Sequence, residues 1–150
     1  FYGYDRRFNF RSIFMEIIAD STDKTKKLAY EIAKKIKEGY VIALYGDLGS
    51  GKTTFVRYLV EGLGLKNRVQ SPTFVVVRRY GNINHVDLYR LSSKEEVLEI
   101  GLEEMMQDKK SITIIEWPEI VEKLLPTNTV KIYFDYIDEK TRKITIKNLH

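Results

Sequence analysis

Residues 46–53, Gly-Asp-Leu-Gly-Ser-Gly-Lys-Thr, have the types and spacing that can hold a phosphate group. They match G-x-x-x-x-G-K-S/T, the P-loop motif. The glycines let the backbone wrap so that successive N–H groups point inward at an anion. The helix expected to begin near Lys52 adds its positive N-terminal end. Lys52 can then reach the β- and γ-phosphates, and the Thr53 hydroxyl can ligate Mg²⁺.

The P-loop match is specific. A chance match in a chain of this length comes to under about 1%, given that glycine makes up about 7% of residues. The motif also lies between a buried apolar run and a helical pattern, which is the context that it requires. We therefore predict a nucleotide-binding loop formed by Asp47, Leu48, Gly49, Ser50, Gly51, Lys52, Thr53 and Thr54.

Two acids are candidates for the remaining chemistry, because each ends an apolar strand. Asp87 follows INHV and Glu116 follows ITII. Phosphoryl transfer with Mg²⁺ needs a carboxylate near the metal and a group that orients the attacking water. A carboxylate at a buried strand end needs compensation for its burial. An exposed acid without a chemical role remains the alternative for each residue.

The elements that must position these residues form an alternating pattern. Apolar side chains recur with helical spacing within 22–38, and Gly39 follows them. The other predicted elements are strands at 16–20, 40–45 and 111–117, helices at 52–64 and from Pro118, a helical stretch over 92–108 broken at Gly101, a strand pair over 74–91 that turns near Gly81, and a hairpin over 128–149. The pattern predicts an α/β fold: a P-loop NTPase-like mixed β-sheet flanked by helices, with a C-terminal β-hairpin.

Composition bounds the class of protein. The 150 residues are 43% apolar, which suffices for one core. Cysteine is absent, which excludes a disulfide framework and suits a cytoplasmic protein. The longest apolar runs are far too short to span a membrane. The net charge of +4 is small and the charges are mixed, so composition alone makes no case for nucleic-acid binding, and no DNA contact is expected.

Four segments in this order together resemble the TsaE (YjeE) family. They are GDLGSGKTTF (46–55), SPTF (71–74), HVDLYRL (85–91) and IIEWPE (114–119). The resemblance spans residues 16 to about 148. It implies a small bacterial ATPase of the pathway that makes threonylcarbamoyladenosine in tRNA. It also implies a complex with the TsaB and TsaD proteins, whereas direct contact with tRNA stays open.

The resemblance also implies roles for individual residues. Thr53 and Glu116 would hold Mg²⁺, and Asp87 would act near the attacking water as base or orienter, together with Lys52. Trp117 would lie against the nucleotide, with a core or interface tryptophan as the alternative. Ser71 and Thr73 would form a switch that senses the γ-phosphate, with an ordinary Ser-Pro turn as the alternative. Thr25 and Glu119 would lie near the nucleotide, and a solvated helix residue is the alternative for Thr25.

The sequence leaves other functions open. A small-molecule kinase would use the same loop, but no segment resembles an arginine-rich lid. A nucleotide-dependent binding module would show no useful turnover. A GTPase is disfavoured, because N-K-x-D and D-x-x-G motifs are absent from the sequence. His85 could act as a base, although a packed, hydrogen-bonded histidine is the favoured interpretation.

The chain is expected to comprise two regions. Residues 1–14 are rich in aromatic side chains and arginine but show no period, and Met15 precedes the first predicted strand. They are expected to be an added or non-core N-terminal extension, with a native arm as the alternative. Residues 15–150 are expected to form a single P-loop ATPase domain.

Overall fold

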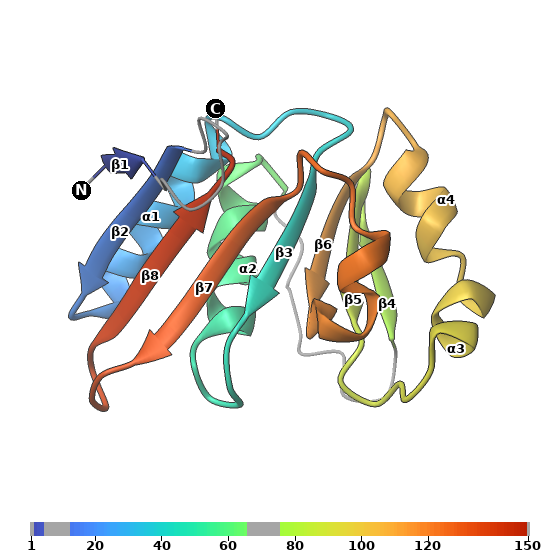
Figure 1. Ribbon diagram of the computed structural model, residues 1–150. Helices are drawn as coiled ribbons and strands as arrows, with labels where there is room; N and C mark the ends of the chain where they lie inside the picture. Colours follow the sequence, from blue (N-terminus) through green and yellow to red (C-terminus); the bar gives the residue numbers. More distant parts are fainter. Residues whose placement is uncertain (1, 5–12, 66–75, 150) are drawn as a thin grey trace.

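The strands form one mixed sheet in the computed structural model, which describes residues 2–4, 13–65 and 76–149 (Figure 1). Within these residues the sheet has eight strands in the order β1-β2-β8-β7-β3-β6-β5-β4. Their bounds are β1 Tyr2–Tyr4, β2 Ile13–Ala19, β3 Val41–Tyr45, β4 Val77–Tyr80, β5 Ile83–Asp87, β6 Ile112–Glu116, β7 Val130–Tyr136 and β8 Arg142–Lys147. The central strands β7, β3, β6 and β5 are parallel, and the outer pairings are antiparallel.

Helices cover both faces of the sheet. They are α1 Thr22–Ala33, α2 Lys52–Gly62, α3 Lys94–Glu99, α4 Leu102–Gln107 and the 3-10 helix η1 Pro118–Leu124. Helices α1 and α2 lie behind the sheet in Figure 1 and enclose a core with alternate residues of β3, β6, β7 and β8. Val97, Leu102 and Val121 of the other helices pack on the opposite face, against β5 and β6. The predicted α/β class, with helices flanking a mixed sheet and a C-terminal hairpin of β7 and β8, is confirmed.

The parallel strands bring four carboxyl ends to one edge of the sheet. In Figure 1 this is the lower edge, where β3, β5, β6 and β7 end. The P-loop leaves β3 at this edge and leads into α2. Asp87 and Glu116 are register partners at the ends of β5 and β6. Open α/β sheets bind their ligands at this edge, so the topology itself gathers the predicted chemical residues.

Local signals set most helix boundaries. The Ser21 hydroxyl accepts the Lys24 N–H at 3.2 Å and caps α1, and Ser93 caps α3 in the same way through the Glu96 N–H. Gly101 separates α3 from α4 with φ 79°, a left-handed conformation that favours glycine. The predicted break at Gly101 is therefore confirmed.

Three predicted elements differ from the structure. Helix α1 ends at Ala33 instead of continuing to residue 38, because the chain turns there and buries Ile36 in the core. The segment after Trp117 is a 3-10 helix, kinked at the buried Val121, instead of an α-helix. The sequence also predicted no element within 1–14, whereas β1 pairs with β2, which begins at Ile13.

Gly62 allows α1 and α2 to approach closely. A Cβ atom there would lie 2.8 Å from the Ala33 Cβ and 3.1 Å from the Tyr30 Cδ1. Gly62→Ala is therefore expected to lower the free energy of unfolding by about 1–2 kcal/mol through overpacking, measured by urea denaturation. In an Ala33→Gly background the same substitution should cost less or become stabilising. An equal cost in both backgrounds would contradict this account of the helix contact.

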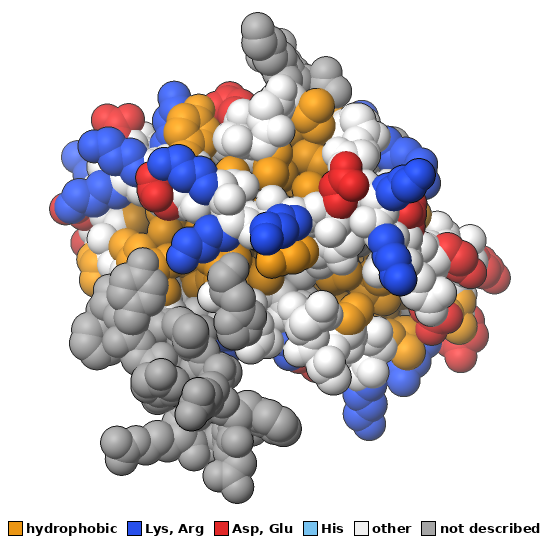
Figure 2. All heavy atoms as spheres, turned by 90° about the horizontal axis from the view of Figure 1, so that it is seen from above, with side chains coloured by type: hydrophobic (Ala, Val, Ile, Leu, Met, Phe, Trp, Pro, Cys, Tyr) orange, Lys and Arg blue, Asp and Glu red, His pale blue; other side chains and the backbone are white. Residues whose placement is uncertain are grey.

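Charged side chains are mixed on the end of the molecule opposite the P-loop. Figure 2 views this end and shows Lys and Arg interspersed with Asp and Glu among apolar side chains. Within the described residues, no helix is long and apolar enough to cross a membrane.

Candidate functional site

The P-loop wraps tightly at the start of α2. Gly46 has φ 148°, and a Cβ there would lie 2.8 Å from both the Phe134 carbonyl oxygen and the Ser50 Oγ. Gly51 precedes α2 with φ 97°, and its carbonyl accepts the Phe55 N–H at 2.9 Å. A side chain at either glycine would strain this turn. The geometry is that of a backbone nest followed by a helix N-terminus, which is the arrangement that binds phosphate.

Lys52 lies inside this site instead of pointing to solvent. Its ammonium donates to the Gly46 carbonyl and lies 3.5 Å from the centre of the Trp117 ring. Burial lowers the pKa of Lys52, although four nearby carboxylates oppose that shift: Glu116, Glu119, Asp87 and Asp47. The cation is thus held where carboxylates converge, at the position from which it can reach a phosphate.

Glu116 lies beside the first turn of α2. Its side chain is buried, and its Oε1 accepts the Thr53 hydroxyl at 3.2 Å. Its Oε2 lies 2.6 Å from the Nε2 of His85, which is also fully buried. The structure therefore brings together Thr53 and Glu116, the two residues expected to hold a metal. His85 is packed and hydrogen-bonded, as favoured from the sequence.

Asp87 stands next to Glu116 at the end of β5. Its Oδ1 accepts the Tyr89 N–H at 2.9 Å, which fixes the carboxylate at the strand end. Burial raises the pKa of Asp87, as does the neighbouring Glu116, while the Tyr89 hydrogen bond opposes the shift. A carboxylate with a raised pKa is a better proton acceptor than an exposed aspartate.

Trp117 has an unusual backbone. It lies directly after β6 with φ 57° and ψ 56°, a left-handed conformation that is rare for a large side chain. Its ring contacts Lys52, and the centre of its ring lies 5.0 Å from the centre of the Tyr89 ring. The strained turn aims the indole at the P-loop lysine, so Trp117 belongs to the site whether or not it also contacts a base.

A cavity of about 470 Å³ adjoins the other side of the loop. Thr25 and Thr54 line it together with Gly49 and Gly51, so Thr25 lies beside the loop as expected. Arg142, from the start of β8, also lines the cavity and donates to the carbonyls of Ser50 at 3.2 Å and Gly49 at 3.3 Å. The role of Arg142 was not predicted from the sequence, because nothing local signals a contact across more than ninety residues.

The remaining predicted residues are placed less centrally. Asp47 and Leu48 are exposed at the tip of the loop, and Glu119 is exposed on η1. Ser50 is buried, and its Oγ has no hydrogen-bond partner among the described residues. Ser71 and Thr73 lie outside the described residues, so their expected switch role stays a prediction.

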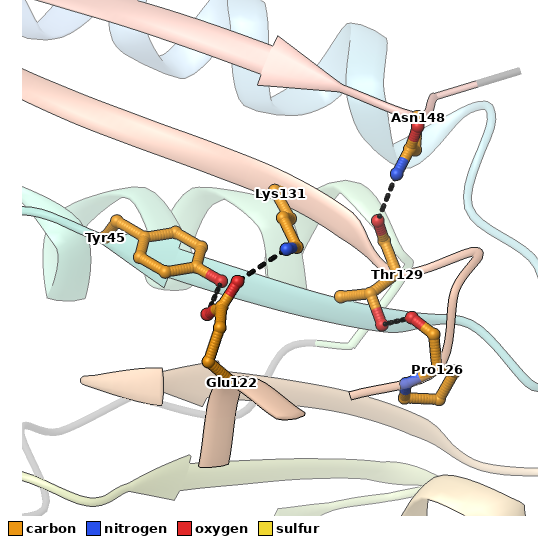
Figure 3. Close-up of polar contacts among 6 residues, drawn as sticks. All are labelled: Tyr45, Glu122, Pro126, Thr129, Lys131 and Asn148. Atoms are coloured by element: carbon orange, nitrogen blue, oxygen red, sulfur yellow. Dashed lines mark hydrogen bonds and ion pairs between the residues drawn. The ribbon is translucent and has the colours of Figure 1, made fainter. Parts of the chain in front are cut away.

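A polar cluster connects η1, the segment that follows β6, with strands β3 and β7. Figure 3 shows Glu122 of η1 between Tyr45 of β3 and Lys131 of β7. Glu122 accepts the Tyr45 hydroxyl at 2.5 Å and the Lys131 ammonium at 2.6 Å. Although burial raises it, these two hydrogen bonds bring the pKa of Glu122 below its ordinary value. The segment after Trp117 is thereby tied to the residue before the P-loop.

The donor atoms suit Mg²⁺ that arrives with a nucleotide. Thr53 and Glu116 offer hard oxygen ligands beside the loop, the type that Mg²⁺ prefers. No group of three or more His, Cys, Asp or Glu residues is arranged as a metal cluster in 2–4, 13–65 and 76–149.

The fold and this site define a P-loop nucleotide-binding protein. The model of the family "Threonylcarbamoyl adenosine biosynthesis protein TsaE" matches residues 19–144. The chain therefore belongs to the TsaE family, which confirms the resemblance noted in the sequence.

Individual relatives agree with this assignment. A protein called tRNA threonylcarbamoyladenosine biosynthesis protein TsaE from Rickettsia bellii (strain RML369-C) is 38% identical over 138 residues, covering 89% of this chain and 94% of the relative. The Bacillus subtilis (strain 168) protein of the same name is 35% identical over 127 residues, covering 82% and 78%. The crystal structure of Bacillus subtilis YdiB superposes with a TM-score of 0.78 at 27% identity, covering 95% of this chain and 90% of that one.

Proposed function

We propose that this protein binds and hydrolyses Mg²⁺–ATP to support threonylcarbamoyl modification of tRNA adenosine, acting with TsaB and TsaD. The observation that carries the ATPase part is the contact between the Thr53 hydroxyl and Glu116 beside the P-loop. Membership of the TsaE family supports the pathway. The absence of cysteine suits a cytoplasmic location, where thiols stay reduced and disulfides rarely persist.

Each residue of the site has a separate task in this reaction. The N–H groups of the P-loop and the Lys52 ammonium bind the phosphates. Thr53 and Glu116 would hold Mg²⁺, and the bound ion would supply positive charge that offsets the charge of the phosphates. Asp87 accepts a proton from the attacking water or orients it, since its raised pKa favours proton exchange.

The described residues support a dependence on a partner protein. P-loop ATPases often need a cation that a second protein inserts beside the γ-phosphate. Arg142 is already committed to the backbone of the loop by two hydrogen bonds. Lys52 is the cation that faces Asp87 and Glu116 in the described part of the site. We therefore expect slow hydrolysis by the isolated protein.

The experiment is phosphate release from Mg²⁺–ATP by the protein alone and then with TsaB and TsaD added. The proposal predicts little release alone and at least a tenfold rise with both partners. No response to either partner would contradict it. If label from γ-³²P ATP instead moved to a metabolite in cell extract, the small-molecule kinase would be the correct function.

A further inference from the structure

His85 is buried beside the candidate site, and the proposed mechanism gives it no role. It lies on β5, two residues before Asp87, and its side chain is fully buried. Its Nε2 lies 2.6 Å from the Oε2 of Glu116, which belongs to the neighbouring strand β6. His85 is covered completely by protein and contacts Glu116 instead of the open P-loop. This placement favours an effect through Glu116 over a direct role as catalytic base.

The hydrogen-bond pattern indicates which ring nitrogen donates. The Nδ1 of His85 is buried and has no hydrogen-bond partner among the described residues. A buried N–H group without a partner is costly, so the proton of a neutral imidazole belongs on Nε2. Nε2–H then donates to Glu116, whose carboxylate can only accept.

The Glu116 carboxylate is consequently held from two sides. Its Oε2 accepts from His85, and its Oε1 accepts from the hydroxyl of Thr53. A glutamate has three rotatable side-chain bonds, and each one left free costs binding energy when a ligand orders it. A partner behind a metal ligand removes this cost and fixes the direction of the coordinating oxygen.

We propose that His85 is a positioning residue that aims the Oε1 atom of Glu116 at Thr53 and at the Mg²⁺ of bound Mg²⁺–ATP. This inference rests on the proposed function, because it assigns a role toward the same metal. It adds a residue whose effect passes entirely through Glu116. The competing explanation is that His85 only fills space beside Tyr80, whose ring centre lies 6.4 Å from its own.

The two explanations differ in how Mg²⁺ affects nucleotide affinity. ATP affinity is measured first in EDTA and then across a Mg²⁺ titration, with thermal unfolding followed for each variant. His85→Leu keeps bulk but removes the donor. This variant should change the ATP affinity measured in EDTA by no more than about threefold. It should raise the Mg²⁺ midpoint, the Mg²⁺ concentration that gives half of the metal-dependent change in ATP affinity, by about 10–100-fold. A shift of this size is the usual consequence of losing a hydrogen-bond partner behind a metal ligand.

Two further variants of His85 distinguish the loss of its hydrogen bond from a folding defect. His85→Gln can place an amide N–H near the original Nε2 position, so it should restore the Mg²⁺ midpoint to within about threefold of wild type. His85→Asn keeps an amide that is one methylene shorter, so it should behave like His85→Leu. Asn84→Leu is the matched control. Asn84 is also buried on β5, but its side chain points to the opposite face of the sheet. Its loss should therefore lower stability without changing the Mg²⁺ midpoint.

The outcomes of these measurements distinguish the positioning role from the space-filling role. An unchanged Mg²⁺ midpoint in His85→Leu or His85→Asn, or the same midpoint shift in Asn84→Leu, would overturn the positioning role. A midpoint for His85→Gln as poor as that of His85→Asn would also overturn it. Wild-type protein that binds ATP equally well with and without Mg²⁺ would instead overturn the magnesium assignment of the proposed function, which is a distinguishable failure.

Discussion

Lys52→Ala is expected to lower the affinity for ATP at least a hundredfold in calorimetric titration. The Lys52 ammonium is buried in the P-loop, where its contacts are the Gly46 carbonyl and the ring of Trp117. Charge-assisted hydrogen bonds to phosphate are the strong class, and removal of a buried donor costs about 3 kcal/mol. The phosphates would also lose the positive charge that faces Asp87, Glu116 and Asp47.

Lys27→Ala provides the control for a general loss of positive charge. Lys27 is exposed on α1, so its removal should leave ATP affinity within about twofold of wild type. Thermal unfolding of both variants separates binding from stability. Unchanged affinity in Lys52→Ala would refute the assignment of residues 46–53 as the phosphate-binding loop.

Asp87→Ala and Glu116→Ala should separate the two carboxylates at the sheet edge. Asp87→Ala is expected to leave Mg²⁺–ATP binding within about threefold but to slow partner-stimulated hydrolysis by about 10²–10⁴-fold, the usual contribution of a positioned acid or base. Glu116→Ala is expected to weaken Mg²⁺–ATP binding, because Glu116 and not Asp87 contacts Thr53. Titration calorimetry and phosphate release on the same preparations measure both effects.

Asp135→Ala is the matched control for these carboxylates. Asp135 lies near the end of the parallel strand β7 but is exposed, so its loss should change neither binding nor turnover by more than about twofold. If Asp87→Ala weakened Mg²⁺–ATP binding more than Glu116→Ala did, the two acids would have exchanged roles.

The sequence predicted the parts of the site that depend on neighbours in the chain. The P-loop needs consecutive residues in one turn, and glycines such as Gly46 are selected by the local backbone. Asp87 and Glu116 were found because each ends an apolar strand. Their placement side by side required the pairing of β5 with β6, which no local pattern encodes.

The contacts across the sheet were beyond prediction for the same reason. Arg142 reaches the P-loop from β8, and Lys52 meets a tryptophan that comes after β6. The order of strands depends on long-range pairing, for which single residues carry no signal. The kink at Val121 likewise reflects tertiary packing, since the segment after Pro118 has an ordinary helical pattern.

The central claim is that ATP hydrolysis at this loop sustains tRNA modification. It is tested most directly by the amount of threonylcarbamoylated tRNA that TsaB and TsaD form over many cycles from tRNA and an activated threonylcarbamoyl donor, with this protein, with Lys52→Ala, or with neither. Repeated turnover is expected with wild-type protein, whereas Lys52→Ala should yield no more product than the reaction without this protein. Equal yields in all three reactions would contradict it.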